Sequence, residues 1–320
     1  MKRCPQNPII TRSDIPPACP QLVDVTSVFN PAATRFRDQI LLLLRVQSRG
    51  RETSLLPATS SDGVQFRVWP EPVRMPGIER LDCKVFHVYD ARITCLEDFY
   101  YITVAIDTDQ GCRIGLARTT DFQNYIFLGA PLEGDARNAV LFPEKIGGRY
   151  VMLCRPNRTR LDGGVATGSE IELAVSDDLK VWRTEAVVMQ GRFHYWDELI
   201  GSGPPPIKTR RGWLHVYHGV ATHFTSSNIY QAGVVLLELE QPQQVIARSR
   251  RNVLEPRELY ELTGQVPNVV FPSGLVPAGI DAEGFVGEDT ELSLYYGAAD
   301  TSVCLATTTV RALLEACDEA

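Results

Sequence analysis

The stretch that decides the fold is residues 89–107, YDARITCLEDFYYITVAID. A polar residue, Asp90, stands near its opening and leads into a strand-like segment. A short acidic turn follows at Glu97-Asp98, and a second apolar strand then ends on Asp107. β-branched and aromatic residues on either side of a polar turn are typical of paired strands. The stretch therefore predicts an all-β unit.

The same plan recurs four more times along the chain. In each unit a polar or proline-bearing opening leads into a strand, a short polar turn follows, and a second apolar strand ends on a polar residue. The other units open at Phe29-Asn30-Pro31, Phe142-Pro143, Pro204-Pro205-Pro206 and Phe271-Pro272. The openings are spaced by about 50 to 65 residues, which is close to the four-strand period of propeller blades.

The later part of each unit also repeats. Three similar segments look like hairpin turns between the outer strands of a blade: Ser60-Ser61-Asp62-Gly63, Thr119-Thr120-Asp121 and Ser176-Asp177-Asp178. Helical composition is confined to Thr309–Ala316 and Glu255–Leu262. The pattern predicts one five-bladed β-propeller domain over residues 1–320, with blades starting near 29, 89, 142, 204 and 271 and a short C-terminal helix. A two-sheet sandwich is the alternative, but it does not explain the repeat.

Composition argues against several classes of partner and several locations for this protein. The chain has 320 residues, 44% of them hydrophobic, and a net charge of -7, which argues against a nucleic-acid-binding surface. Its N-terminus has no apolar stretch of signal-peptide length, and its apolar runs are too short to span a membrane. The eight cysteines include no Cys-x-x-Cys pair and no zinc-ligand spacing. Those in apolar runs (Cys95, Cys154 and Cys304) are expected in the core, and we expect a cytoplasmic protein without a bound metal.

Polar residues recur at two positions of the repeat. Asn30 and Asp90 occupy the opening, and the ends of the second strands carry Arg45, Asp107, Arg155, His218 and Asp300. Because the first strand of every propeller blade lines the central channel, these side chains should converge there. Carboxylates together with cationic groups suit a sugar and an oxyanion such as phosphate. The competing interpretation is that each of them only caps a strand or pairs with a neighbouring blade.

Two further features bear on this pocket. Arg92 lies two residues after Asp90 and would share its face on a regular strand, where a guanidinium lowers the pKa of a neighbouring carboxyl group. A carboxylic acid that must donate a proton needs the opposite shift, and the sequence does not resolve this conflict; one resolution is that another partner holds Arg92, which then orients the pocket. The segment His194–Glu198 concentrates aromatic and acidic groups, and its Trp196 could stack on a sugar ring or lie in the core.

Several segments resemble glycoside hydrolase family 130, which contains β-mannoside phosphorylases and related β-mannosidases. The resemblance covers the chain from Asn30 to the C-terminal helix. It rests on residues 89–94 (YDARIT), 137–144 (RNAVLFPE), 153–156 (LCRP), 203–209 (GPPPIKT), 217–220 (YHGV) and 295–300 (YYGAAD). The family fold is a five-bladed propeller, in agreement with the repeat.

The resemblance implies an inverting phosphorolysis of β-mannosides, such as mannosyl-glucose or β-mannooligosaccharides, to α-mannose 1-phosphate and a shortened acceptor. Asp90 would be the general acid, acting through a hydroxyl of the mannosyl unit. The resemblance also implies that Asn30 and Asp300 hold the sugar and that Arg137, Arg155 and His218 bind phosphate. From their positions in the repeat and near Asp90, Arg45 and Arg92 are predicted to bind the substrate as well. Inorganic phosphate is then a co-substrate, and no cofactor is expected.

One position departs from the family pattern. The phosphorylases usually carry a phosphate-binding lysine just before the Gly-x-Gly-Pro turn, and Leu199 stands there in this chain. This keeps open an inverting β-mannosidase that uses water, with Glu198 or Asp197 as the base. A non-catalytic glycan-binding propeller is the third hypothesis. The sequence does not set the linkage (β-1,2 or β-1,4) or the identity of the acceptor sugar, but acceptor choice should depend on loops at 158–169, 222–228 and 77–83. The oligomeric state is left open, with a homo-oligomer as one candidate.

Overall fold

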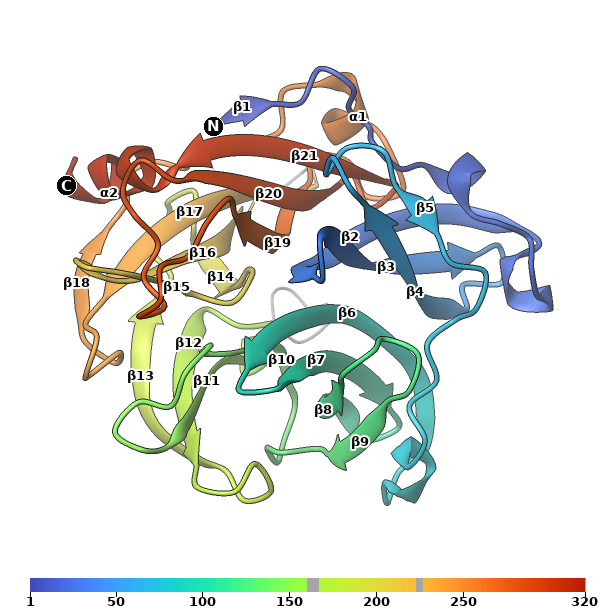
Figure 1. Ribbon diagram of the computed structural model, residues 1–320, viewed down its shortest axis with the longest axis horizontal. Helices are drawn as coiled ribbons and strands as arrows, with labels where there is room; N and C mark the ends of the chain where they lie inside the picture. The colour runs from blue at the N-terminus through green and yellow to red at the C-terminus, as the bar shows by residue number, and fades with distance from the viewer. Residues whose placement is uncertain (160–166, 223–226, 320) are drawn as a thin grey trace.

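The computed structural model describes residues 1–159, 167–222 and 227–319, and over these residues the chain forms five antiparallel β-sheets. Figure 1 shows the sheets arranged as blades around a central axis. Within each sheet neighbouring strands mostly follow one another in sequence order, so every blade is built on a meander; the exceptions are β1, which pairs with β21, and β15, which pairs with β16 beside β14. The predicted all-β five-bladed propeller is confirmed. Two of the loops that are expected to determine acceptor specificity are described only in part. Their residues 160–166 and 223–226 lie outside the described residues.

The first three blades have four strands each. Blade 1 contains β2 to β5 (Val25–Phe36, Gln39–Ser48, Thr53–Ser60 and Arg67–Val68). Blade 2 contains β6 to β9 (Val85–Leu96, Phe99–Thr108, Gly111–Thr119 and Ile126–Gly129). Blade 3 contains β10 to β13 (Ala136–Leu141, Tyr150–Pro156, Glu170–Ser176 and Arg183–Gln190).

The last two blades are less regular. Blade 4 contains β14 to β18 (Leu199–Ser202, Ile207–Thr209, Gly212–Ala221, Ile229–Leu237 and Val245–Arg248), and both β14 and β15 pair with β16. Blade 5 contains β19 to β21 (Val270–Pro277, Glu291–Ala298 and Ser302–Thr309). The innermost strands thus begin one to six residues before the blade starts expected from the sequence.

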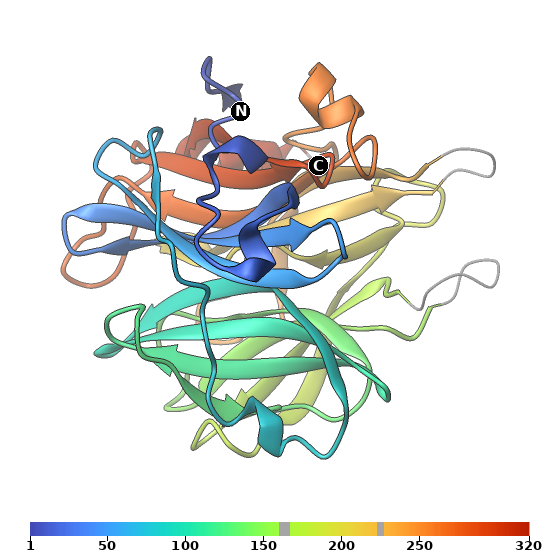
Figure 2. The same ribbon diagram turned by 90° about the vertical axis from the view of Figure 1, so that its right-hand side faces the viewer.

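The N-terminal segment closes the ring. Strand β1 (Lys2–Arg3) pairs with β21 and becomes the outer strand of blade 5, which the sequence repeat did not predict. Figures 1 and 2 both place β1 beside the short helix α1 (Leu259–Leu262), and Arg3 forms an ion pair of 2.8 Å with the buried Glu261 of that helix. Three 3-10 turns complete the elements (Arg12–Asp14, Pro20–Leu22 and Ile78–Arg80).

The C-terminal helix α2 (Val310–Asp318) packs on blades 4 and 5, as its amphipathic pattern predicts. Its buried side chains join the apolar cluster between these two blades. The hydroxyl of the N-cap residue, Thr309, accepts a hydrogen bond of 3.2 Å from the backbone N–H of Ala312. Five large apolar clusters are found among the described residues, and each fills the interface between two adjacent blades.

The three predicted outer hairpin turns are confirmed and share one geometry. Each strand ends on a hydroxyl residue that accepts a hydrogen bond from the backbone N–H three residues on (Ser60, Thr119 and Ser176). An aspartate two residues later accepts from two further backbone N–H groups (Asp62, Asp121 and Asp178). Hydroxyl and carboxylate side chains therefore replace the ladder hydrogen bonds where the chain reverses.

One expectation about the core is wrong. Cys154 and Cys304 are buried, but Cys95 is exposed, because its neighbours Thr94 and Leu96 on β6 take the inward positions of the strand. All eight cysteines lie in the described part of the chain, and none of them is in a disulfide. In the same part of the chain no helix is long and apolar enough to cross a membrane.

The innermost strand of every blade is interrupted at a corresponding point. Register shifts fall between Phe29 and Ala32 in β2, between Tyr89 and Arg92 in β6, between Arg137 and Val140 in β10, and between Pro272 and Gly274 in β19. In blade 4 the segment 203–206, with three prolines that cannot donate a ladder hydrogen bond, separates β14 from β15. These bulges bend the strand and direct side chains toward the axis.

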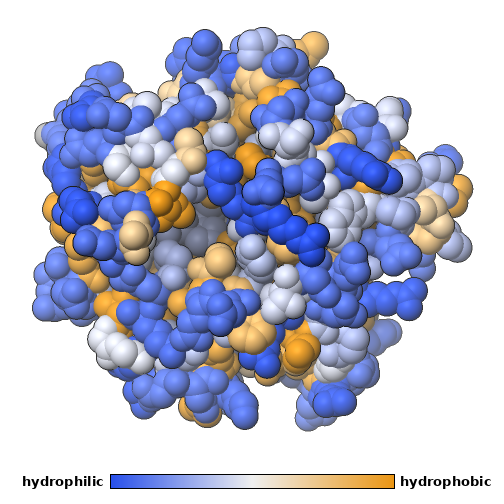
Figure 3. All heavy atoms as spheres, viewed as in Figure 1, coloured by the Kyte–Doolittle hydropathy of each residue, from blue (hydrophilic) through white to orange (hydrophobic). Residues whose placement is uncertain are grey.

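The two ends of the channel differ. The second strands run toward the end that carries Arg45, Arg155 and His218. The opposite end holds an apolar cavity of about 350 Å³ lined by all five blades, with Ala33, Ile93, Pro143, Pro205 and Leu275 among its residues. Figure 3 looks onto this opposite face, where the surface is hollowed near the centre.

Candidate active site

Three of the predicted residues meet at Asp90. This residue lies in the bulge of β6 with a positive φ of 51°, and Asn30 occupies the equivalent place in β2 with φ 47°. Asn and Asp tolerate this left-handed conformation better than other residues with a Cβ atom. Asp90 Oδ1 accepts hydrogen bonds from Asn30 Nδ2 at 3.0 Å and from Arg45 Nη1 at 2.9 Å. Blades 1 and 2 thus hold one carboxylate between an amide and a guanidinium.

The guanidinium of Arg45 is fixed from both sides. It lies over the ring of Phe29 at 4.5 Å and over the ring of Tyr89 at 4.4 Å. Burial raises the pKa of Asp90, but the charges of Arg45 and Arg92, with the hydrogen bonds from Asn30 and Arg45, outweigh burial and bring the pKa below the usual carboxyl value. In the unliganded protein Asp90 is therefore ionised at neutral pH.

Arg92 has backbone partners, which is one of the outcomes that the sequence left open, and its charge still lowers the pKa of Asp90. It is 1% exposed, and its Nε donates to the carbonyl of Gly203 at 2.7 Å, while Nη1 donates to the carbonyls of Asp90 and Ala91 at 3.1 and 2.9 Å. The register shift between Tyr89 and Arg92 interrupts the alternation that would place its side chain beside the carboxylate. The side chain of Arg92 thus stabilises the bulge by binding its backbone carbonyls. Of the guanidinium nitrogens of Arg92, only Nη2 has no partner among the described residues.

Asp300 follows β20 in a left-handed turn with φ 48°. Burial raises its pKa to about 6, and the negative charge of Asp90 adds to this, although Arg45 acts in the opposite direction. The two carboxyl groups therefore share the field of Arg45 but have pKa values shifted in opposite directions. Such a divergence is typical of sites that carry out proton transfer.

Arg137 and Arg155 form a cationic group in the same site as Asp90, which we call the cationic wall. Arg137 Nη2 is 3.4 Å from Asp107 Oδ1, which also accepts a hydrogen bond of 2.7 Å from the hydroxyl of Tyr89. Arg155 is 8% exposed and donates to Asn157 Oδ1 at 2.8 Å, and it forms no ion pair within the described residues. Burial, followed by repulsion from Arg137, lowers the pKa of Arg155 to about 10. A buried guanidinium without a carboxylate is suited to an external anion.

His218 completes this group from β16. Its ring lies 4.6 Å from the ring of Phe271, and neither ring nitrogen has a hydrogen bond of good geometry within the described residues, although the backbone of Ser202 is close. Burial and the charges of Arg155 and Arg92 hold the pKa of His218 well below its usual value. The sequence treated His218 as a potential cation, whereas its lowered pKa makes it a neutral imidazole with a single N–H group.

Gly201 allows this close packing. It lies opposite His218 in the β14–β16 pair. A Cβ atom at this position would be 2.5 Å from His218 Cε1 and 2.8 Å from Asn138 Oδ1. Asn138 has φ 53° in the bulge of β10 and is the third member of the series that begins with Asn30 and Asp90. Asn138 was not predicted as a site residue, because blade 3 was expected to start near Phe142, whereas β10 begins at Ala136; the motif Arg137-Asn138-Ala139, which resembles Tyr89-Asp90-Ala91, is the signal for it.

The residues suggested as a hydrolytic base lie elsewhere. Asp197 is fully buried and accepts hydrogen bonds from Arg192 at 2.8 Å, from the hydroxyl of Tyr217 at 2.8 Å and from Arg248. A carboxylate held by two cations and a phenol stabilises blade 4 and has no free oxygen for water, which argues against its role as a base. Glu198 accepts a hydrogen bond from the hydroxyl of Thr222 and lines a separate pocket. Leu199 is buried on β14 and adds no charge to the site.

Comparison with known proteins identifies the family. The sequence model of glycoside hydrolase family 130, described as β-1,4-mannooligosaccharide phosphorylase, matches residues 1–319. The chain belongs to glycoside hydrolase family 130. The family 130 relatives include a β-1,4-mannooligosaccharide phosphorylase of Ruminococcus albus, 32% identical over 95% of this chain and 87% of that protein. A 1,2-β-oligomannan phosphorylase of Thermoanaerobacter sp. is 33% identical over 88% and 89% of the two chains.

A solved family 130 structure agrees with the fold. The β-1,2-mannobiose phosphorylase of Listeria innocua, in complex with β-1,2-mannobiose, matches 100% of this chain and 99% of its own with a TM-score of 0.85 at 26% identity. The resemblance drawn from the sequence motifs is therefore confirmed. Among the described residues of this family 130 protein, no group of three or more His, Cys, Asp or Glu side chains could hold a metal ion.

Proposed function

We propose that this protein catalyses the inverting phosphorolysis of β-mannosides to α-mannose 1-phosphate and a shortened acceptor. The observation that carries the proposal is a largely buried carboxylate, Asp90, in the same site as the guanidinium groups of Arg137 and Arg155, which have N–H donors without partners among the described residues. Phosphate bound there would attack the anomeric carbon from the face opposite the leaving group. A phosphate nucleophile needs no second carboxylate to activate water. Relatives named as phosphorylases of β-linked mannosides support the same reaction class.

Each residue then has a distinct task. Asn30, Arg45 and Asp300 would hold the mannosyl unit next to Asp90, and the spare Nη2 of Arg92 would donate to the same region. Asp90 would supply the proton for the departing oxygen through a hydroxyl of the mannosyl unit. His218 would donate its single imidazole N–H to a phosphate oxygen beside the two arginines.

The low pKa of free Asp90 is compatible with an acid that is protonated only when its ligands are bound. A phosphate anion would offset the positive charges of Arg137 and Arg155, and a bound sugar would exclude water from the carboxyl group. Both changes disfavour the ionised form and so raise the pKa of Asp90. The acid would therefore become competent only in the ternary complex.

Hydrolysis by water is the second candidate, and Leu199 is the observation that favours it, because this side chain replaces an expected ammonium ligand of phosphate. The contacts of Asp197 and Glu198 argue against hydrolysis, because neither carboxylate lies free beside the cationic wall.

The eight unpaired cysteines support a reducing compartment, so we propose the cytoplasm as the location.

One experiment separates these functions. The purified protein is incubated with β-1,2- and β-1,4-linked mannosides, with and without inorganic phosphate, and the products are resolved by NMR. Phosphate-dependent formation of α-mannose 1-phosphate supports the proposal. Free mannose at a rate indifferent to phosphate contradicts it in favour of hydrolysis. Absence of any product, combined with equal glycan affinity of the wild type and Asp90→Asn, indicates a glycan-binding propeller.

A further inference from the structure

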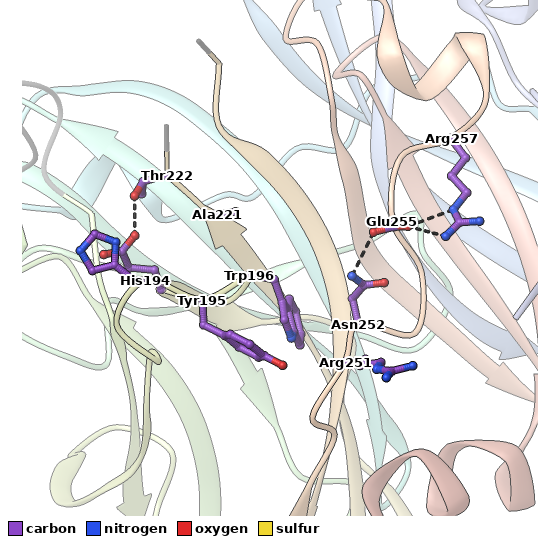
Figure 4. Close-up of a pocket in the computed structure, with 10 residues that line it drawn as sticks. His194, Tyr195, Trp196, Ala221, Thr222, Arg251, Asn252, Glu255 and Arg257 are labelled. Carbon is purple, nitrogen blue, oxygen red and sulfur yellow. Dashed lines mark hydrogen bonds and ion pairs between the residues drawn. The ribbon is translucent and has the colours of Figure 1, made fainter. Parts of the chain in front are cut away.

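The aromatic and acidic segment 194–198 lies outside the group around Asp90 but lines a pocket of its own. This pocket has a volume of about 650 Å³ and is formed in blade 4 by residues from three segments (His194, Tyr195, Trp196, Glu198, Ala221, Thr222, Arg251, Asn252, Glu255 and Arg257). Figure 4 shows the rings of Tyr195 and Trp196 beside the polar side chains of Asn252 and Arg251. Aromatic faces together with amide, carboxylate and guanidinium groups are the usual components of a carbohydrate site.

The aromatic wall is built rigidly. The indole of Trp196 stacks on the ring of Tyr217 at 5.8 Å with an interplanar angle of 23°, and its Nε1 donates to the carbonyl of Arg250 at 2.9 Å. A Cβ atom at Gly219 or Gly233 would collide with this indole, so two glycines reserve its place. Trp196 is therefore oriented before any ligand arrives, which lowers the entropic cost of binding.

Tyr195 is held against the same wall but remains open to solvent. The guanidinium of Arg192 lies 4.5 Å from the ring of Tyr195 and 5.5 Å from the ring of Trp196, while Arg192 also pairs with the buried Asp197 at 2.8 Å. Tyr195 is 37% exposed. An aromatic residue fixed from behind and open in front is a preformed stacking surface.

The polar wall is also ordered. Asn252 Nδ2 donates to Gln231 Oε1 at 2.7 Å and to Glu255 Oε2 at 3.1 Å, and Arg257 donates to Glu255 Oε1. In these contacts Asn252 uses only its amide nitrogen, so its amide oxygen can accept a hydrogen bond from a ligand. Arg251 is exposed at the mouth of the pocket. The wall thus offers an acceptor and a donor for sugar hydroxyl groups.

The pocket is linked to the cationic wall along two paired strands. Thr222 comes four residues after His218 at the end of β16, and Glu198 comes three residues before Gly201, at the start of β14. At about 3.3 Å per residue, Thr222 lies roughly 13 Å beyond His218. This separation exceeds the length of one sugar ring, so a ligand that reaches from the region of His218 to the pocket must span more than one ring.

We propose that this pocket is a distal subsite for the leaving part of a β-mannooligosaccharide, with Tyr195 and Trp196 stacking on a sugar ring and Arg251 and Asn252 binding its hydroxyl groups. The inference rests on the proposed phosphorolysis and specifies its substrate as a chain of three or more sugars. The pocket therefore determines chain-length preference and takes no part in bond cleavage.

The test compares chain lengths. Initial rates of mannose 1-phosphate release are measured for β-mannobiose, β-mannotriose and β-mannotetraose of both linkages, with the wild type, Tyr195→Ala and Arg251→Ala. We expect kcat/KM of the wild type to rise with length, and each variant to lose about 3- to 10-fold of that rise, the range of one aromatic or polar contact. The disaccharide rate should not change. Phe193→Ala is the matched control, because Phe193 is 82% exposed in the same segment but does not line the pocket.

Two results would overturn the subsite: a wild type indifferent to chain length, or variants that lose the same factor on the disaccharide as on the tetraose. Binding to the Asp90→Asn background by calorimetry separates this inference from the proposed reaction. If no substrate is phosphorolysed but Asp90→Asn binds the tetraose more tightly than the biose, and Tyr195→Ala removes that difference, the reaction fails and the subsite stands. If Asp90→Asn binds both lengths equally, the subsite is refuted.

Discussion

Replacing Arg155 by Met should separate phosphate binding from stability, because this guanidinium is buried without a carboxylate partner. Its pKa of about 10 leaves it charged at neutral pH. A charged hydrogen bond contributes about 1.5–3 kcal/mol, which corresponds to a rise of roughly 10- to 150-fold in the KM for phosphate. The KM for the mannoside should change little, because Asp90, Asn30 and Arg45 are not altered.

The stability of the same variant should not fall. Because the pKa of Arg155 is lowered from its ordinary value of 12.5 to about 10, keeping it charged costs folding roughly 3 kcal/mol at pH values below both. Met removes this cost and also removes one hydrogen bond to Asn157, of about 1.5–3 kcal/mol. The two changes nearly cancel, so the free energy of unfolding should remain equal or rise by up to about 1.5 kcal/mol.

The assay is the initial rate of mannose 1-phosphate release at varied phosphate, combined with urea unfolding at pH 7. Arg149→Met is the matched control, since Arg149 pairs with Glu185 at 2.5 Å on the surface and should leave the KM for phosphate unchanged. Phosphate should also raise the Tm of the wild type more than that of Arg155→Met. Loss of stability with an unaltered KM for phosphate would refute the reasoning, because Arg155 would then be a structural residue.

Other changes test the remaining parts of the site. Asp300→Asn should stabilise the protein relative to the wild type at pH 8 but not at pH 4. The pKa of Asp300 is raised to about 6 in the folded protein, so the wild type loses stability as Asp300 ionises with rising pH. Thermal unfolding of both proteins across this pH range measures the difference. Leu199→Lys should lower the KM for phosphate by about 10-fold, the effect of one charged contact, if the position faces the anion. Arg45→Met should destabilise the protein by up to about 3 kcal/mol at pH 7, since it removes the ion-pair partner of Asp90 and leaves the hydrogen bond from Asn30, and Asp90→Asn in the same chain should recover part of that loss in a double-mutant cycle.

The fold was readable from the sequence because each blade repeats one strand–turn–strand plan. The outer turns could be placed to the residue, since a hydroxyl followed two residues later by aspartate fixes a local geometry. The closure of the ring by β1 could not be read, because a two-residue strand carries no periodic signal and owes its position to the exposed edge of β21. The prediction that Cys95 lies in the core was wrong for a similar reason, since composition does not show toward which side of the sheet a strand residue points.

The site was predicted at the level of which residues converge but not in their charge states. Asn30, Arg45 and Asp90 meet as the repeat required. The bulge between Tyr89 and Arg92 could not be predicted, because it adds residues that no hydrophobic pattern marks, although the expected effect of Arg92 on the pKa of Asp90 is present. The neutral state of His218 depends on burial and on neighbouring arginines from other blades. Such interactions arise only after the blades close into a ring.

The two halves of the site are electrically coupled, and this coupling gives an order to the reaction. Arg137 interacts with the charges of both Asp107 and Asp90, so it links the cationic wall to the acid. An anion bound beside Arg137 would oppose part of the positive charge that acts on Asp90, whose main cationic neighbours are Arg45 and Arg92, and would favour uptake of a proton by the carboxyl group. Because the same event supplies the nucleophile and protonates the acid, a mannoside bound without phosphate would face an ionised Asp90. The propeller would thereby suppress cleavage by water without needing to exclude water from the channel.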